Sequence, residues 1–168
     1  MTYASATSFL SRFGAAEIAQ RADRGIPRLV TAQLLLDAAA GADLSSYTST
    51  EVTRVATVLA LVNQALADAA DTINSYISGR YTVPLSGVPG VLERTACELA
   101  RYNLYDDQVT DVIKARYDAS IKYLTSVSRG DVSLGVDEAT SQPVPSSAGA
   151  ELVTAGRVWQ RGDSQGFL

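Results

Sequence analysis

The chain has 168 residues, no histidine, one cysteine and a formal net charge of −4, and this length fits a single domain. The absence of histidine removes the commonest general base and zinc ligand, and with them every Ser-His or Cys-His catalytic pair. The mildly acidic balance argues against a free-standing nucleic-acid binder, which usually carries a basic excess. The lone cysteine, Cys97, cannot form an internal disulfide, and its apolar neighbours indicate a buried thiol rather than a nucleophile.

No pattern for a cofactor, metal or membrane is present in the sequence. It contains no glycine-rich phosphate loop and no calcium-loop spacing of acidic residues. The adjacent carboxylates Asp106 and Asp107 could bind Mg²⁺, but their position between two predicted helices favours a solvated turn. The first twenty residues lack a signal-peptide pattern, and no apolar stretch approaches the roughly 20 residues that span a bilayer. We expect no catalytic site, no metal and no cofactor, and the expected compartment is the cytoplasm of the cell that makes the protein.

Three short helices are predicted before residue 42. Ser5 and Thr7 are candidate N-caps of the first helix, and Gly14 interrupts it. The second is expected over 15–22 and the third over 31–40, with a glycine directly after it as a C-terminal stop. The apolar residues expected to face inward are Phe9, Leu10, Phe13 and Ile18.

A long helix is predicted next, and it is the clearest element of the sequence. Thr48 and Glu51 have capping-box spacing, and Gly79 has the position of a C-terminal stop about 28 residues later. Between them runs an apolar stripe of helical period, made of Val55, Leu59, Val62, Leu66, Ala69, Ile73 and Tyr76. A second row widens this face with Val58, Leu61 and Ala65. The helix should therefore touch more than one neighbour, either the short N-terminal helices or another chain.

Two further main helices are predicted after a loop over 80–88, in which Pro84 blocks helix formation. The first begins with Pro89 in its opening turn and runs to about 106. The second spans about 110–128 and is closed by a glycine. Their inward faces are expected to be Val88, Leu92, Ala96, Leu99 and Tyr102 for the first, and Val109, Ile113, Tyr117, Ile121 and Leu124 for the second.

Six tyrosines fall in or beside the three main predicted helices: Tyr76, Tyr81, Tyr102, Tyr105, Tyr117 and Tyr123. Tyrosine is enriched at subunit interfaces, and it also packs at the edge of helical cores with its hydroxyl hydrogen-bonded. Both interpretations stay open. Candidate partners for these rings, or for carboxylates across an interface, are Arg80, Arg94, Arg101 and Arg116.

The last part of the chain has a different character. After Gly135 the sequence has no period, and it carries Pro143, Pro145 and a Ser/Ala/Gly cluster, which is linker composition. Apolar residues that a solvated tail would not need follow this linker: Leu152, Val153, Val158, Trp159 and Phe167. We therefore predict a mainly α protein with a small helical bundle over 1–134 and an extended C-terminal arm over 135–168, anchored either on a partner or on its own domain.

Several motifs together resemble a known family. The segments ALADAADTINSYISGRYTVPL and VPGVLERTACELARYNLYDD resemble the Mu-like phage proteins, a family formerly of unknown function that is associated with head–tail connection. The opening MTYASATSFLSRFG, the later stretch RYDASIKYLTSVSRGDVSLGVD and the ending RVWQRGDSQGFL are also similar to this family. The segment 26–50 departs from the family pattern, which is shorter there, so the resemblance says nothing of its fold or partners.

The resemblance implies a structural role in the neck of a long-tailed phage virion. Such adaptors, also called head-completion or connector proteins, form a ring beneath the portal, usually of twelve copies, which joins head to tail around a channel that DNA crosses without sequence-specific binding. The implied partners are the portal protein, neighbouring copies of the chain and a tail-side neck protein. The arm residues expected to bind the portal or a neighbouring subunit are Leu152, Arg157, Val158, Trp159 and Phe167.

The sequence leaves two alternative functions open. A head-closure or tail-terminator protein would also belong to the neck, but those roles are often filled by β-rich folds. A helical DNA-binding regulator would use the turn near 106–110 as part of a helix-turn-helix. The helix after that turn begins at Asp111 and lacks the basic or amide residues that read base edges. An enzyme is disfavoured because no catalytic constellation is present.

Overall fold

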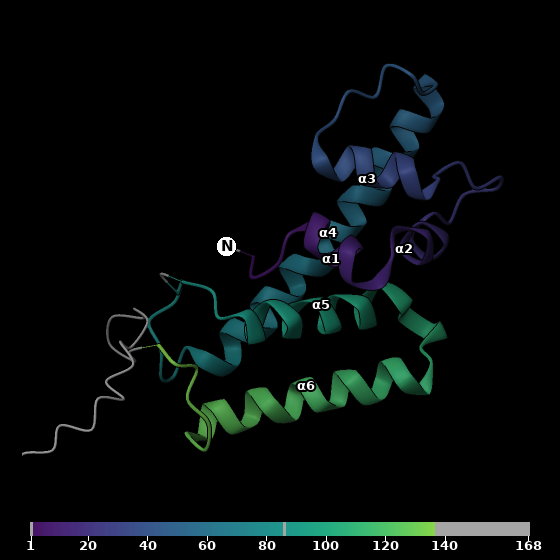
Figure 1. The fold of residues 1–168 in the computed structure, drawn as a ribbon. Helices are drawn as coiled ribbons and strands as arrows, with labels where there is room; N and C mark the ends of the chain where they lie inside the picture. Colours follow the sequence, from purple (N-terminus) through teal and green to yellow (C-terminus); the bar gives the residue numbers. More distant parts are fainter. Residues whose placement is uncertain (1, 86, 137–168) are drawn as a thin grey trace, which may run out of the picture.

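The computed structural model describes residues 2–85 and 87–136, and the elements in this part of the chain are helical. Figure 1 shows their arrangement along the chain. The elements are α1 (Ala6–Phe13), α2 (Ala15–Ala22), α3 (Ala32–Ala40), α4 (Ser49–Ile77), α5 (Gly90–Tyr105), the 3₁₀ helix η1 (Asp106–Gln108) and α6 (Asp111–Arg129). The prediction of a mainly α bundle with one long central helix is confirmed.

The helix boundaries follow from local capping chemistry. The Thr48 hydroxyl accepts a hydrogen bond from the Glu51 backbone N–H at 3.3 Å, while the Glu51 carboxylate accepts from the Thr48 N–H at 2.8 Å. This is the predicted capping box, and it satisfies two N–H groups that the first turn of α4 leaves without helical partners. Ser5 caps α1 in the same way together with Ser8, so Ser5 rather than Thr7 is the N-cap.

One expected helix end is wrong in detail, and a second is confirmed in position but not in backbone conformation. Pro89 lies at the N-cap position of α5 rather than inside its first turn, so Val88 precedes the helix and is 43% exposed. Gly79 directly follows the cap residue Ser78, but it is not one of the glycines with positive φ. The chain instead leaves α4 through a further turn, in which the Tyr81 N–H bonds the Ile77 carbonyl at 2.9 Å. A left-handed glycine is therefore not needed at this end.

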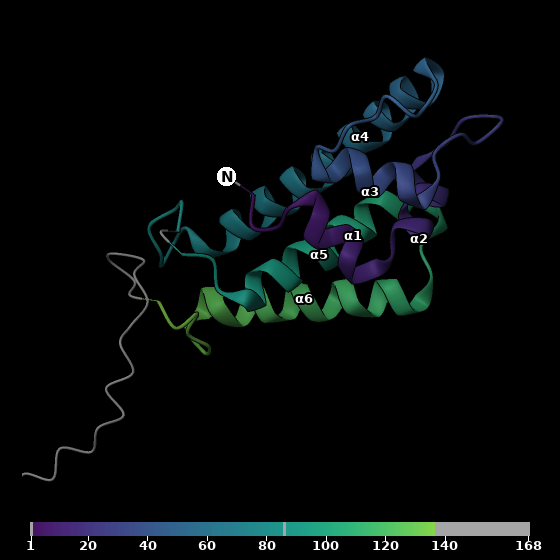
Figure 2. The same ribbon diagram turned by 45° about the horizontal axis from the view of Figure 1, so that its top comes forward.

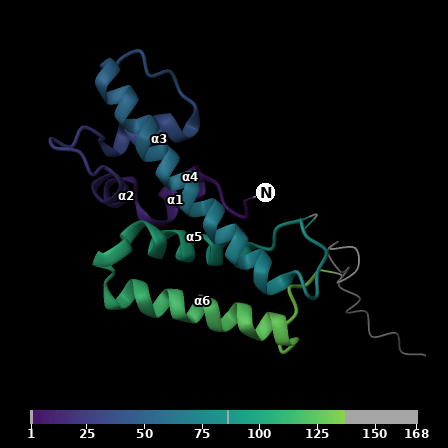
Figure 3. The same cartoon turned by 180° about the vertical axis from the view of Figure 1, so that it is seen from behind.

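The core is organised around α4, which contacts every other α-helix of the described chain. The short helices α1, α2 and α3 gather toward its N-terminal half (Figure 2). Its C-terminal half crosses α5, and α6 runs alongside α5, as the view from behind shows (Figure 3). The second apolar row thus faces the chain's own helices at Val58 and Ala65, which are buried, whereas Leu61 of the same row is 43% exposed.

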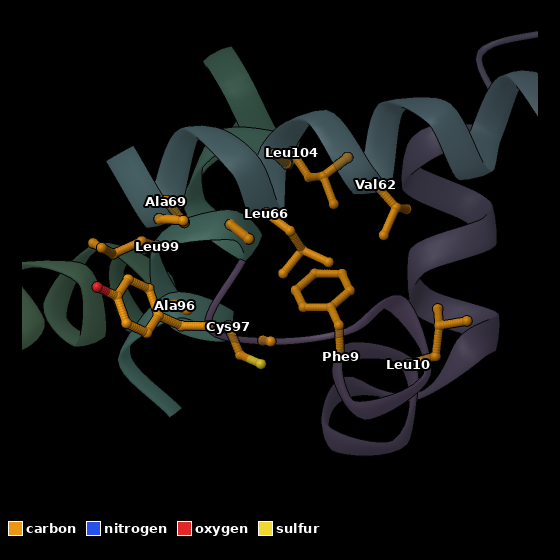
Figure 4. Close-up of a cluster of buried hydrophobic side chains, with 14 of the residues drawn as sticks. Phe9, Leu10, Val62, Leu66, Ala69, Ala96, Cys97, Leu99 and Leu104 are labelled. Carbon is orange, nitrogen blue, oxygen red and sulfur yellow. The ribbon is translucent and has the colours of Figure 1, made fainter. Parts of the chain in front are cut away.

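The centre of the core lies where α1, α4 and α5 meet. Figure 4 shows the Phe9 ring of α1 beside Leu66 of α4, with Cys97 and Leu99 of α5 in the same cluster. Each of these side chains is at most 2% exposed. The alternation of three- and four-residue steps on α4 therefore buries a continuous stripe against two sets of neighbours.

The segment after α6 returns to the loop between α4 and α5. The Leu134 backbone N–H donates to the hydroxyl of the buried Tyr81 at 3.1 Å, and Val136 is buried in the core cluster. Packing of the chain on the helical bundle thus continues through residue 136. The division into a domain over 1–134 and an arm over 135–168 stays a prediction, because residues 137–168 lie outside the described part.

A buried carboxylate organises the loop between α2 and α3. Asp23, directly after α2, accepts hydrogen bonds from the backbone N–H groups of Gly25 at 3.0 Å, Leu29 at 2.8 Å and Val30 at 3.0 Å. An Arg54 guanidinium nitrogen of α4 lies 3.6 Å from the carboxylate oxygen that also accepts from Gly25. Burial alone would raise the pKa of Asp23, but these donors and Arg54 together lower it below its ordinary value.

Candidate assembly surface

The arm residues predicted to bind a partner lie outside the described residues. These are Leu152, Arg157, Val158, Trp159 and Phe167, so their role stays a prediction. In the described part of the chain, no helix is both long and apolar enough to cross a membrane. Nor do the residues of that part include three or more potential metal ligands in one cluster.

The predicted turn near Asp106 carries an exposed carboxylate. Asp106 begins η1 with a φ of 50°, and its carboxylate is 3.8 Å from the Arg24 guanidinium, with both side chains more than half exposed. An exposed pair at this distance contributes little stability. The location of Asp106 agrees with the interpretation of the acidic pair as a solvated turn.

The tyrosines are used mainly in packing within the chain. Tyr102 of α5 stacks on Tyr117 of α6 with ring centroids 4.0 Å apart, and Tyr81 is buried in the core. The Tyr105 hydroxyl donates a hydrogen bond to Glu17 of α2 at 2.7 Å. Burial, and to a smaller extent this hydrogen bond, raises the pKa of Tyr105. Of the two open interpretations, packing at the edge of the core accounts for these rings.

The Glu17 carboxylate also receives Arg101, one of the candidate interface arginines. Its guanidinium donates to Glu17 at 2.7–2.8 Å and lies 4.6 Å from the centre of the Phe13 ring. Arg101 thus links α5 to the two N-terminal helices α1 and α2 through an ion pair and a cation–π contact. It is not available for another chain.

A small cavity opens beside the N-terminus. It has a volume of about 240 Å³ and is lined by Thr2, Tyr3, Asn74, Val83, Pro84, Leu85 and Val88. On its wall the Tyr3 hydroxyl donates to the Asn74 side-chain oxygen at 2.5 Å, and burial raises the pKa of Tyr3. The hydrogen bond ties the N-terminal segment to α4, which gives this wall a structural role.

The solvent-facing side of α4 is low in charge. We call it the α4 outward face; its exposed residues are Ala56, Thr57, Ala60, Leu61, Gln64, Asp68 and Asp71. No charged residue occurs between Arg54 and Asp68, whereas solvent faces of helices in globular proteins are usually charged. Small side chains over these turns let another helix approach closely, and the two aspartates make the C-terminal part of the face acidic.

A groove lies between α5 and α6. We call it the α5–α6 groove; it has a volume of about 280 Å³ and is lined by Arg94, Thr95, Glu98, Arg116, Ala119, Ser120 and Tyr123. One Glu98 carboxylate oxygen is 3.5 Å from the Arg116 guanidinium. The other oxygen is buried and has no hydrogen-bond partner among the described residues. Buried carboxylate oxygens are nearly always hydrogen-bonded, so the unpaired Glu98 oxygen can still accept a hydrogen bond from a donor.

Cys97 is predicted to be unreactive in the native protein. It is buried in α5, and burial raises the pKa of its thiol to about 11, so about 0.1% is thiolate at pH 8. We expect a chromogenic disulfide reagent to label the native chain only as fast as it unfolds, and denaturant to expose one thiol per chain. Rapid labelling of native protein at pH 8 would contradict the placement of Cys97 in the core.

Sequence comparisons agree with the motifs that suggested a Mu-like phage protein. The family model described as Bacteriophage Mu, Gp36 matches residues 3–153. The Mu-like prophage FluMu protein gp36 of Haemophilus influenzae is 44% identical over 109 residues, which cover 65% of this chain and 77% of that protein. Gene product J of Escherichia phage Mu is 36% identical over 94 residues, covering 56% of this chain and 64% of that protein. Because the family match spans most of the sequence, the chain belongs to the bacteriophage Mu Gp36 family.

Proposed function

We propose that this protein is a head–tail connector, an adaptor that forms a ring beneath the portal of a phage particle and joins the head to the tail around the DNA channel. Membership of a phage protein family supports a role in phage biology. The observation that carries the structural role is the α4 outward face, an exposed helix surface without charge over 55–67. Such a surface suits lateral packing between identical copies better than it suits free solution.

The proposed mechanism is assembly, without catalysis. Neighbouring copies would contact one another through the helical bundle, and the C-terminal arm would bind the portal or a neighbour through Leu152, Arg157, Val158, Trp159 and Phe167. A linker-like arm loses conformational entropy when it binds. Burial of its aromatic anchors offsets this loss. The chain's net charge of −4 also suits a channel that DNA must cross without adhering.

The helical fold bears on the two alternatives. The described elements are helical, which favours an adaptor over the β-rich folds often found in head-closure and tail-terminator proteins. Helix α6, which follows the turn of a would-be helix-turn-helix, begins with Asp111 at its exposed start. An acidic N-terminus is unsuited to a recognition helix in the major groove, where phosphates surround it.

The proposal predicts that the full chain binds the portal oligomer of the phage that encodes it. Size-exclusion chromatography and native mass spectrometry of the mixture should detect a complex with several copies per portal. A chain ending at Val136, which keeps the buried Leu134 and Val136, should bind much more weakly. Trp159→Ala should weaken binding by about 30-fold, the effect of losing a hot-spot aromatic of about 2 kcal/mol.

The control for this experiment is the fold of each variant. Circular dichroism and thermal melting of the shortened chain and of Trp159→Ala should match those of the full chain, because neither change touches the described core. Failure of the full chain to bind the portal would reject the adaptor role. Equal binding by all three proteins would keep that role and reject the arm as its anchor.

A further inference from the structure

We propose that the α4 outward face of one copy packs into the α5–α6 groove of the next copy. This inference rests on the proposed ring and names the two surfaces that build it. A ring of identical chains in head-to-tail order needs two different surfaces that complement each other, because each copy binds one neighbour with the first surface and the other neighbour with the second. The two surfaces complement each other in hydrogen bonding, shape and charge.

The first argument is the unmet hydrogen bond in the groove. The buried Glu98 oxygen lacks a donor, and the remaining groove side chains leave it unsatisfied. Gln64, near the middle of the α4 outward face, donates one amide N–H to Asp68 at 2.7 Å. A side-chain amide has two N–H donors, so Gln64 has a second one to give. The Glu98 side chain is 14% exposed, so a turn of its carboxylate on docking would bring the unpaired oxygen to this amide donor.

The second argument is the size of the side chains on the two surfaces. Ala56 and Ala60 lie on the α4 outward face, and Ala119 lines the groove with Ala115 exposed one turn away on α6. Alanines on both sides let two helices approach within the shorter distances of helix packing, roughly 8 Å between axes. Leu61 on one surface and Val112 on the other are large apolar side chains left in solvent, 43% and 62% exposed. Contact between copies would bury both.

The third argument is charge. After Arg54, helix α4 carries Asp68 and Asp71 and no cation through its last residue, Ile77. The groove carries Arg94 and Arg116 against the single carboxylate of Glu98. Asp71 and Arg94 are both exposed, and neither makes a hydrogen bond or ion pair with another described residue. These two side chains are therefore free to pair between copies, and electrostatic complementarity of this kind sets the register of an interface.

The test is a charge exchange across the proposed contact. Asp71→Arg and Arg94→Asp, each in the full chain, should weaken ring formation by about tenfold or more, because each places like charges together. The double variant restores opposite charges and should return to within about threefold of wild type. Ring formation is followed by analytical ultracentrifugation of the chain, alone and on the portal oligomer. Both residues lie on the surface, so thermal melting of the three variants should match that of wild type.

A cross-link provides a second measurement. Gln64→Cys combined with Ala119→Cys should link neighbouring copies with a short bismaleimide, while Gln64→Cys combined with Ile26→Cys, whose loop position is 99% exposed and outside both surfaces, should not. The buried Cys97 should not react.

The outcomes separate this contact from the ring itself. A wild-type chain that forms no ring, alone or on the portal, overturns the proposed function and this contact together. If rings persist in both single variants and the specific cross-link does not form, the contact is wrong while the ring stands. Loss in the single variants, restoration in the double variant and the specific cross-link would together establish it.

Discussion

Replacing Leu66 with alanine is expected to lower the free energy of unfolding by about 2–5 kcal/mol, the range for removing a buried leucine and leaving a cavity. Leu66 is 2% exposed and lies in the middle of α4, beside Phe9 of α1. The surrounding helices are held by their own caps and contacts, so they can close the cavity only in part. Urea unfolding followed by circular dichroism measures the change.

Leu61 provides a matched control in the same helix. It is 43% exposed, so Leu61→Ala should change the free energy of unfolding by at most about 0.5 kcal/mol. If Leu61 belongs to the contact between copies, the same substitution should weaken assembly while stability is kept. Similar destabilisation by both substitutions would show that α4 is rotated from the orientation described, with its second apolar row fully buried.

Asp23→Ala is expected to destabilise the protein by about 3 kcal/mol, because buried N–H groups that lose their acceptor suffer the full desolvation penalty. The carboxylate is fully buried and accepts three backbone N–H groups from Gly25, Leu29 and Val30. No other residue in 2–85 or 87–136 is placed to replace those bonds, so the loop between α2 and α3 should open as well. Hydrogen exchange at residues 25–30 would detect the opening, and denaturant unfolding would give the energy.

Arg54→Ala separates the ion pair from the hydrogen bonds. The Arg54 side chain is 36% exposed and lies 3.6 Å from Asp23, so its loss should lower the free energy of unfolding by about 1 kcal/mol or less. Equal effects of Asp23→Ala and Arg54→Ala would mean that the ion pair, rather than the backbone bonds, holds the loop.

The Asp23 contribution should also depend on pH in a definite direction. Its folded-state pKa is below the ordinary value near 3.9, so its charged form stabilises the fold at all pH values above that. The contribution is lost as the pH falls through the folded-state pKa. The stability difference between wild type and Asp23→Ala should thus be constant from pH 5 to pH 8 and shrink below about pH 4. A difference that grew on acidification would contradict the lowered pKa.

Features governed by neighbours in the sequence could be predicted well. The capping box at Thr48 and Glu51 closes within one helical turn, and the left-handed Gly41 and Gly130 end their helices for local steric reasons. The position of α4 and its buried stripe follow from its period. The error at Pro89 concerns one residue at the edge of a pattern. The exposure of Leu61 could not be predicted, because periodicity does not determine which neighbour packs there.

Features that join distant parts of the chain were not visible in the sequence. Asp23 reads as an ordinary helix-ending residue, and nothing in the sequence says that a loop folds back so that Leu29 and Val30 donate to it. The α5–α6 groove and its unpaired Glu98 oxygen depend on how two helices pack side by side. Val136 shows the same limit, because its burial depends on the loop around Tyr81 that receives the returning chain.

The sequence by itself determined the helical class, the helix positions and the family, because these rest on residue types and short spacings. Only the tertiary structure decided which apolar residues stay in solvent and which polar atoms lack a partner. Those properties are sums over contacts between residues far apart in the chain, and no local pattern encodes them. The α4 outward face and the α5–α6 groove, from which the assembly proposals follow, are both of this kind.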